Sequence, residues 1–168
     1  CHIPPTAKAV GFLWLNSVII IKILSVFEPG GEEALRKKSK DIAVGKIPQY
    51  TDMFKQMRDK LSETGGVGLA MPQVGINERA FIMMNGKKLI TCVNPVITKK
   101  SHSVVMIREG CLSVSGYEVK IPRSQSIEVQ YFDENRKLRR ETLAGLEAII
   151  FQHELDHLNG VLIIDQIA

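Results

Sequence analysis

The hydrophobic period of this chain changes once, and that change limits the folds it can adopt. Between residues 80 and 143, short apolar runs and alternating apolar residues are typical of β-strands. A second set of residues then recurs at helical spacing: Leu146, Ile149, Ile150, His153 and His157. Asn159 and Gly160 end this helix. A block of strands followed by one late helix predicts an α+β domain.

The strand region predicts two antiparallel hairpins. In residues 80–94, two apolar runs flank Asn85-Gly86, a strong signal for a tight hairpin turn. In residues 126–143, alternating apolar residues lead into a polar turn at 133–135 and on to a partner strand. Cys92 falls within a strand of the first hairpin, so we expect a buried, unreactive thiol there.

The first third of the chain predicts fewer elements. Val18 to Val26 is typical of a buried β-strand that enters the domain. The charged run 36–40 predicts a solvated surface turn. Apolar residues from 50 to 61 recur at helical spacing and stop at Gly65-Gly66, which predicts an amphipathic helix with a glycine end.

Composition excludes several classes of protein. The chain has 168 residues, 45% of them hydrophobic and 24% charged, which suits one globular domain. Lys and Arg number 22 against 18 Asp and Glu, a mild excess without clustering, so we expect no specific nucleic-acid partner. The apolar run 9–21 is shorter than the ~20 residues that span a bilayer, so we expect no membrane association. Three widely spaced cysteines favour a reducing, cytoplasmic location.

Residues 153–157 read His-Glu-Leu-Asp-His, an H-E-x-x-H motif. Residues i and i+4 of a helix lie on one face, so the imidazoles of His153 and His157 can reach the same metal ion. Glu154 is offset by one position, where it can exchange a proton with water beside the metal. The pentapeptide also occurs in helices that bind no metal, so the hypothesis needs a third ligand.

The third ligand is expected upstream of the helix. The extended peptidase motif would place a His at position 163, where this chain has Ile163. Asp165 is the single carboxylate after His157, so a downstream Glu ligand is missing as well. Cys111 is the best candidate, because a thiolate is a strong, soft donor and Gly110 lets the backbone approach a metal.

The segment Gly66-Val67-Gly68-Leu69-Ala70-Met71-Pro72-Gln73 lies between a predicted helix and a predicted strand. It is no dinucleotide-binding loop, because it follows a helix and Met71 occupies the position of the final glycine. Its small residues predict a backbone that comes close to an extended ligand, and Gln73 offers an amide donor.

Together, segments 66–73, 109–113 and 152–157 resemble the three motifs of peptide deformylase, in the same order. The resemblance implies antiparallel β-sheets packed around the H-E-x-x-H helix. It also implies a hydrolase that removes the N-formyl group from the N-terminal formylmethionine of nascent polypeptides and releases formate. It covers residues 18–168, expected as the catalytic domain, and leaves 1–17 as an N-terminal extension without an assigned role.

The resemblance also implies roles for individual residues. The metal ligands fall on Cys111, His153 and His157, and the catalytic acid–base group on Glu154. The donors to the developing oxyanion would be the Gln73 side-chain amide and the Leu112 backbone N–H. The pocket for the methionine side chain and the adjoining peptide backbone would be lined by Val67, Gly68, Ile107, Leu146, Ile149 and Ile150. Glu109 and Arg123 match a pair that braces the cysteine loop.

Further expectations concern the metal and the partners. The family usually carries one divalent ion, Fe²⁺ in the cell, with Zn²⁺, Ni²⁺ and Co²⁺ as alternatives. Bacterial members dock on the ribosome by a C-terminal helix that this chain lacks, so we do not expect ribosome docking. We also expect a monomer. The chain departs from the usual pattern at Met71, in place of alanine, and at Ser115, often proline. Met71 is expected to add bulk beside the substrate channel.

Two alternatives remain open. The chain could be an amide hydrolase or peptidase of other specificity. It could also be a degenerate deformylase-like protein whose three ligands bind a structural metal with a fourth, Cys92 or His102. His102 lies in a polar stretch, so we expect it in a solvated loop.

Overall fold

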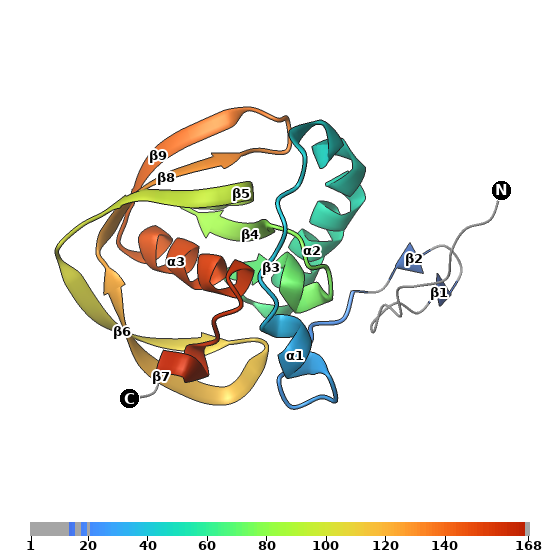
Figure 1. Ribbon diagram of the computed structural model, residues 1–168, viewed down its shortest axis with the longest axis horizontal. Coiled ribbons are helices and arrows are strands. Elements are labelled where there is room, and N and C mark those ends of the chain that lie inside the picture. The colour runs from blue at the N-terminus through green and yellow to red at the C-terminus, as the bar shows by residue number, and fades with distance from the viewer. Residues whose placement is uncertain (1–13, 16–17, 20, 167–168) are drawn as a thin grey trace.

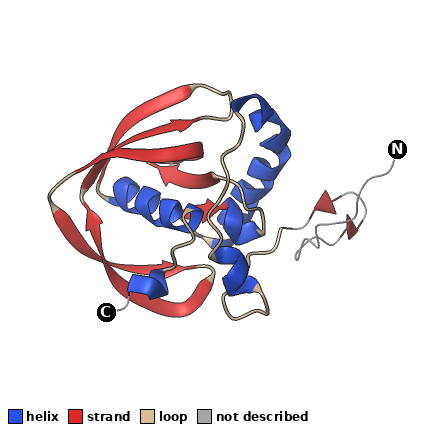
Figure 2. Ribbon diagram, viewed as in Figure 1, coloured by secondary structure: helices blue, strands red, loops and turns tan. Residues whose placement is uncertain are grey.

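The computed structural model describes residues 14–15, 18–19 and 21–166, and its fold is α+β, as predicted (Figures 1 and 2). Helix α3 (Leu146–Leu158) lies between a five-stranded sheet and the hairpin of β6 and β7. Both layers contact the helix. Because both sides of α3 are covered, most of its residues are buried, including the polar residues Gln152, Glu154 and His157.

Within the described residues, the large sheet is antiparallel throughout, with strand order β3-β4-β5-β8-β9. Its strands are β3 (Gly68–Ala70), β4 (Ala80–Asn85), β5 (Lys88–Lys100), β8 (Ser126–Phe132) and β9 (Leu138–Ala144). Both predicted hairpins are therefore confirmed. On β8, the alternating residues Ile127, Val129 and Tyr131 are buried, as their spacing predicts.

The turn of the first hairpin differs from the prediction by one residue. Asn85 still belongs to β4 and pairs with Lys88, so the loop consists of Gly86 and Lys87. Gly86 has φ +59°, a left-handed conformation that glycine adopts without steric cost. The loop therefore begins at Gly86, and Asn85 is the last residue of β4.

A second, smaller sheet consists of β6 (Val104–Cys111) and β7 (Val114–Ser124). Leu112 and Ser113 connect the two strands, and the register shifts between Gly110 and Cys111. The sequence patterns did not predict this hairpin. It places Cys111 at the end of β6.

The remaining helical elements pack around both sheets: one helix contacts β3 and β4 of the large sheet, and the last helical turn contacts β6 and β7. The predicted helix is confirmed as α2 (Thr51–Thr64), and Gly65 ends it with φ +68°. The shorter helical elements are α1 (Gly31–Leu35), η1 (Val44–Tyr50), η2 (Met71–Val74) and η3 (Ile163–Gln166). After α1, the side chains of Arg36, Lys37, Lys38 and Lys40 are exposed, as the charge run predicts.

The predicted strand from Val18 to Val26 is wrong for most of its length. A two-residue strand, β2 (Val18–Ile19), pairs with β1 (Trp14–Leu15), and residues 21–25 belong to no sheet. Instead, the Leu24 N–H donates to the Gln73 carbonyl at 2.7 Å, and the Val26 N–H donates to the Ser113 carbonyl at 3.0 Å. The apolar pattern reflects side-chain burial here, without a strand ladder. Apart from Trp14 and Leu15, the predicted extension 1–17 lies outside the described residues.

The core attaches α3 firmly to the large sheet. The rings of Phe81 on β4 and Phe151 on α3 meet edge to face, with centroids 5.1 Å apart. Cys92 is fully buried in the same cluster, and burial raises the pKa of its thiol well above the usual value. A thiol held in its neutral form is a poor nucleophile, which agrees with the predicted inert role.

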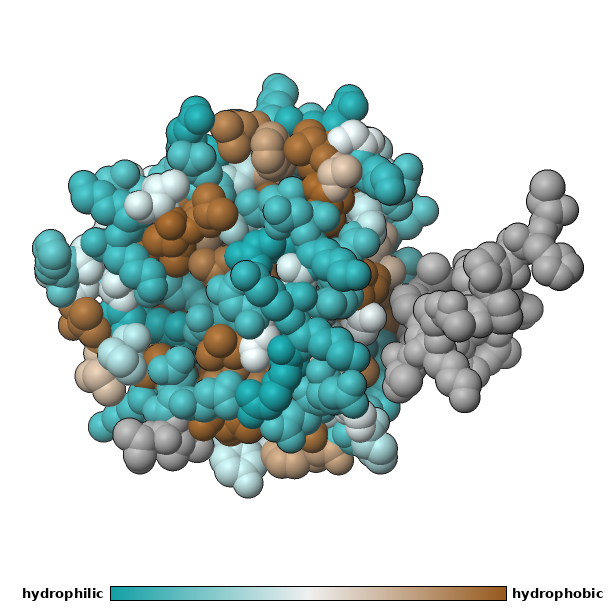
Figure 3. All heavy atoms as spheres, viewed as in Figure 1, coloured by the Kyte–Doolittle hydropathy of each residue, from teal (hydrophilic) through white to brown (hydrophobic). Residues whose placement is uncertain are grey.

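The face shown in Figure 3 is mostly hydrophilic, with small apolar patches between charged side chains. In the part of the chain that the structure describes, no helix has both the length and the apolar character needed to cross a membrane.

Candidate active site

Two histidines and a cysteine converge at the centre of the fold. The rings of His153 and His157, one turn apart on α3, have centroids 5.0 Å apart. Cys111, at the end of β6, places its Sγ 3.2 Å from His157 Nε2. One ligand atom from each of the three residues lies within 4.8 Å of the others. The helix thus supplies two donors and the hairpin supplies the third.

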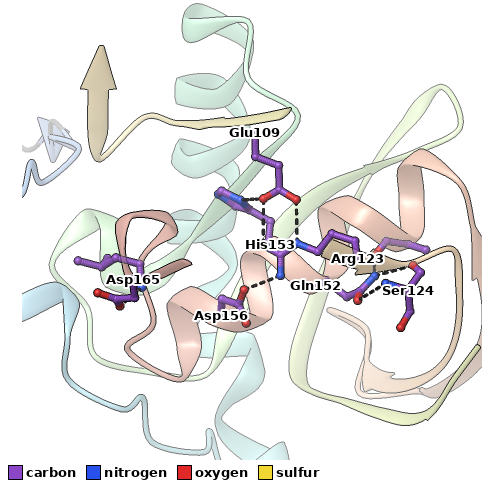
Figure 4. A network of polar contacts seen from close by, with 9 residues as sticks. Glu109, Arg123, Ser124, Gln152, His153, Asp156 and Asp165 are labelled. Carbon is purple, nitrogen blue, oxygen red and sulfur yellow. Dashed lines mark hydrogen bonds and ion pairs between the residues drawn. The ribbon is translucent and has the colours of Figure 1, made fainter. Parts of the chain in front are cut away.

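His153 is oriented by a buried ion pair (Figure 4). Its Nδ1 lies 2.8 Å from Glu109 Oε2, so the other ring nitrogen is the one that can face the cysteine. Arg123 donates to both oxygens of Glu109, at 2.7 and 2.9 Å. A carboxylate that holds the outer nitrogen of a histidine is the usual support for a metal-binding imidazole.

The fourth member of this network, Asp156, was missed by sequence reasoning. Arg123 donates to Asp156 Oδ2 at 2.6 Å, which links β7 to the middle of the H-E-x-x-H motif. The neighbouring Gln152 donates to the Ser124 carbonyl at 2.9 Å and accepts from the Ser124 N–H at 3.1 Å. The only sequence signal for Gln152 and Asp156 was their place within segment 152–157. Neither a glutamine nor an aspartate by itself indicates a contact with β7.

The network controls the charge of its members. Burial alone would raise the pKa of Glu109, but hydrogen bonds from Arg123 and His153 outweigh it and lower the pKa to about 2. Burial lowers the pKa of His153, yet its contacts with Cys111 and Glu109 raise the pKa overall to about 10. Burial lowers the pKa of His157 well below its usual value, which leaves a neutral imidazole suited to metal ligation.

Glu154 is buried beside the three donors. Its side chain is 3% exposed, and burial raises the pKa of its carboxyl group to about 7. Oε2 has no hydrogen-bond partner within the described residues. A carboxyl group with a pKa near neutrality and an unpaired oxygen can both accept and return a proton.

Gly68 makes room for this carboxylate. A Cβ atom on Gly68 would lie 2.2 Å from Glu154 Oε1 and 2.7 Å from Cδ. Real Cβ atoms do not approach other atoms so closely. A side chain at position 68 would therefore force the Glu154 carboxylate to move, and glycine leaves it in place.

A cavity of about 760 Å³ opens beside these groups. All six residues predicted to contact the substrate line it: Val67, Gly68, Ile107, Leu146, Ile149 and Ile150. Cys111, His153 and Glu154 line the same cavity, so the structure brings the predicted pocket and the predicted chemistry together. Ser115 and Tyr117 also line it; neither was predicted to do so, and no motif marks Tyr117.

The two predicted oxyanion donors also line the cavity. Gln73 is 2% exposed, and its Oε1 accepts the Ala70 N–H at 2.8 Å. This bond directs Nε2 toward the site, where it lies 3.2 Å from Ser113 Oγ and 3.8 Å from Cys111 Sγ. Leu112 lies in the connection between β6 and β7, next to Cys111.

The expectation that Met71 adds bulk to the substrate channel is wrong. Its side chain is fully buried in the core cluster that contains Phe54, Met57 and Leu61 of α2. Met71 begins η2 and packs under α2, whereas Gln73, two residues later, faces the cavity.

A fourth protein ligand is not found at the site within residues 21–166. Cys92 is buried in the core between the sheet and α3, and His102 is exposed, as its polar surroundings predict. Neither belongs to the cluster of Cys111, His153 and His157. The described donors thus resemble an open catalytic site more than a closed structural one.

A cysteine sulfur and two imidazoles beside a buried carboxyl group, in an α+β fold with an H-E-x-x-H helix, define a metal-dependent hydrolase. Residues 23–168 match the model of the polypeptide deformylase family. The chain belongs to this family.

Similar proteins agree with this assignment. The peptide deformylase of Thermotoga neapolitana is 40% identical over 141 residues, which are 82% of this chain and 83% of that protein. The crystal structure of a probable peptide deformylase from Synechococcus phage S-SSM7 has a TM-score of 0.80 and 35% identity, and the match covers 87% and 99% of the two chains. A Synechococcus elongatus peptide deformylase in complex with actinonin has a TM-score of 0.81 and 30% identity, over 99% and 88%.

The chain is therefore an enzyme that hydrolyses the formyl amide of formylmethionyl peptides. Family membership also implies a single catalytic metal, and the cluster of Cys111, His153 and His157 is a possible site for it.

Proposed function

We propose that Cys111, His153 and His157 hold one divalent metal ion, and that Glu154, Gln73 and Leu112 act on the formyl amide beside it. One observation carries the proposal: a thiol sulfur lies 3.2 Å from a neutral imidazole nitrogen, while the neighbouring histidine is fixed by a carboxylate on its outer nitrogen. Sulfur and imidazole donors suit Fe²⁺, Zn²⁺, Ni²⁺ and Co²⁺, and we propose Fe²⁺ as the ion in the cell.

A divalent ion bound there supplies Lewis-acid chemistry: it makes water a nucleophile near neutral pH and polarises the formyl carbonyl. Glu154 accepts the proton that the attacking water loses. It then returns this proton to the methionine nitrogen as the carbon–nitrogen bond breaks. The oxygen of water ends in formate, and the peptide leaves with a free amino group. The unpaired Oε2 of Glu154 is the atom that carries the proton.

The remaining residues stabilise and orient the substrate. The carbonyl oxygen gains negative charge during the attack, and the Gln73 amide and the Leu112 N–H are placed to donate to it. Loss of one such donor typically costs about 10²–10³ in kcat. The apolar side chains of Val67, Ile107, Leu146, Ile149 and Ile150 receive the methionine side chain, with Gly68 beside the peptide backbone.

The Glu109–Arg123 pair holds the cysteine strand and His153 in register, since both charges are buried and fully paired. We assign residues 18–168 to the catalytic domain. Every group named in the proposal comes from one chain, so a monomer is sufficient for catalysis. We propose that the reaction takes place on nascent peptides in the cytoplasm.

The proposal is tested by anaerobic purification, metal analysis and a formate-release assay on formyl-Met-Ala-Ser. We expect one divalent ion per chain, loss of formate release after chelation, and recovery when Fe²⁺ or Zn²⁺ is added. A protein that keeps full activity without metal would contradict the proposed ligand set.

Substrate competition separates this activity from a general amide hydrolase or peptidase. We expect hydrolysis of formyl-Met-Ala-Ser and no cleavage of unblocked Met-Ala-Ser. Cleavage of the unblocked peptide at an internal bond would favour a peptidase.

Replacement of Gly68 by alanine is expected to lower kcat for formate release by about 10²-fold, because the new methyl group displaces the Glu154 carboxylate by an ångström or more. Gly45→Ala is the matched control, since a Cβ at that position meets nothing within 4 Å. Metal content should be unchanged in both variants. Equal kcat in the two variants would show that Glu154 does not depend on the space at Gly68.

A further inference from the structure

Two aromatic side chains stack on the surface next to the catalytic cavity. Phe27 precedes α1, and Tyr117 belongs to β7. Their ring centroids lie 5.9 Å apart, with an angle of 28° between the rings. Phe27 is 61% exposed and Tyr117 is 51% exposed. Within residues 21–166, no other Phe or Tyr side chain is exposed to this degree.

The pair is continuous with the cavity. Tyr117 lines the cavity together with Cys111, His153 and Glu154. Phe27 is fixed beside it through the backbone, because the Val26 N–H donates to the Ser113 carbonyl at 3.0 Å. The Phe27 N–H itself donates to Ser25 Oγ at 3.2 Å. The two rings therefore extend the apolar lining of the cavity outward, onto a segment far away in sequence.

Core packing among the described residues does not explain this arrangement. Neither ring belongs to a buried cluster, and each leaves more than half of its side chain in contact with water. Exposed aromatic residues that adjoin a cavity are typical of binding surfaces, where a rigid ring gains contact area at little entropic cost. When formylmethionine occupies the cavity, the residues that follow it in the peptide must extend out of the cavity opening.

We propose that Phe27 and Tyr117 form a subsite for an apolar, preferably aromatic, side chain at one of the two peptide positions that follow formylmethionine. The proposal rests on the proposed function, since it deepens the substrate class of the same cavity. A third ring that stacks on this pair gains about 0.5–1.5 kcal/mol beyond burial, which corresponds to about a two- to tenfold change in affinity.

The test compares formyl-Met-Ala-Ser with formyl-Met-Phe-Ser and formyl-Met-Ala-Phe. We expect one phenylalanine peptide to show a KM lower by about two- to tenfold than formyl-Met-Ala-Ser, with similar kcat. Phe27→Ala, Tyr117→Ala and the double variant should lose this preference. Tyr117→Phe should preserve it. Met106→Ala is the control, because Met106 is exposed on the same hairpin but does not line the cavity.

A binding measurement keeps the two proposals separable. Calorimetry with the product peptides Met-Ala-Ser, Met-Phe-Ser and Met-Ala-Phe reports on the subsite without hydrolysis. Absence of formate release from every peptide would contradict the proposed function, while the calorimetric preference would still support the subsite. Equal KM and equal affinity for all peptides, or a preference that survives in the Phe27→Ala, Tyr117→Ala double variant, would overturn the subsite.

Discussion

Glu154→Gln is expected to lower kcat/KM for formyl-Met-Ala-Ser by about 10²–10⁴, the usual contribution of a general acid–base group. The amide has nearly the shape of the carboxyl group, so the cavity and the neighbouring Gly68 are undisturbed. It cannot accept the proton of water. The three metal ligands are untouched, so the metal content should stay at one ion per chain. Formate release and metal analysis on the same preparation measure both effects.

The same variant should not be less stable than the original protein. Glu154 is 3% exposed and its Oε2 has no partner, so its burial contributes little to the folded state. Glu147→Gln is the matched control, two turns earlier on α3; among residues 21–166, its carboxylate accepts one hydrogen bond, from the Gly86 N–H at 3.2 Å. We expect this control to retain full activity. If Glu154→Gln and Glu147→Gln show equal kcat/KM, a group other than Glu154 accepts the proton that the attacking water loses.

The parts of the site that could be predicted from sequence are those set by local geometry. His153 and His157 meet because helical residues four apart share a face, and that spacing is visible in the sequence. The helix itself was predicted from its apolar period and its Asn-Gly end, and the structure has it at Leu146–Leu158. Cys111 could be selected because the downstream sequence offers no suitable ligand, although its distance from His157 depends on tertiary structure.

Features that depend on packing between distant segments could not be predicted. The partnership of Arg123 with Asp156 joins a strand to a helix, and no spacing rule connects positions 33 residues apart. Met71 looked like a substrate-channel residue because its neighbours are, yet its side chain enters the core under α2. The residues from Val18 to Val26 are apolar enough for a strand, but single hydrogen bonds to Gln73 and Ser113 take the place of a ladder.

Arg123→Met is expected to cost about 3–5 kcal/mol of unfolding free energy, because it leaves buried charges without a partner. Arg123 is 7% exposed and pairs with Glu109, which is equally buried, and with Asp156. Methionine fills similar space but supplies no donor. Glu109 would then keep only its hydrogen bond with His153 among the partners in the described residues, and Asp156 would lose the contact that Arg123 now makes. Urea unfolding of the metal-loaded protein measures the loss.

The comparison that decides this prediction is Arg108→Met. Arg108 forms an exposed pair with Glu118 at 3.5 Å on the same hairpin, and such surface pairs contribute about 0–1 kcal/mol. Arg123→Lys retains a positive charge and should lose less than Arg123→Met, which keeps the measurement useful if the latter folds poorly. Because Glu109 orients His153, Arg123→Met should also weaken metal retention during dialysis, typically by 10–100-fold in affinity. An unfolding free energy equal to that of Arg108→Met, with unchanged metal retention, would mean that the buried network is not what holds the cysteine strand and the helix together.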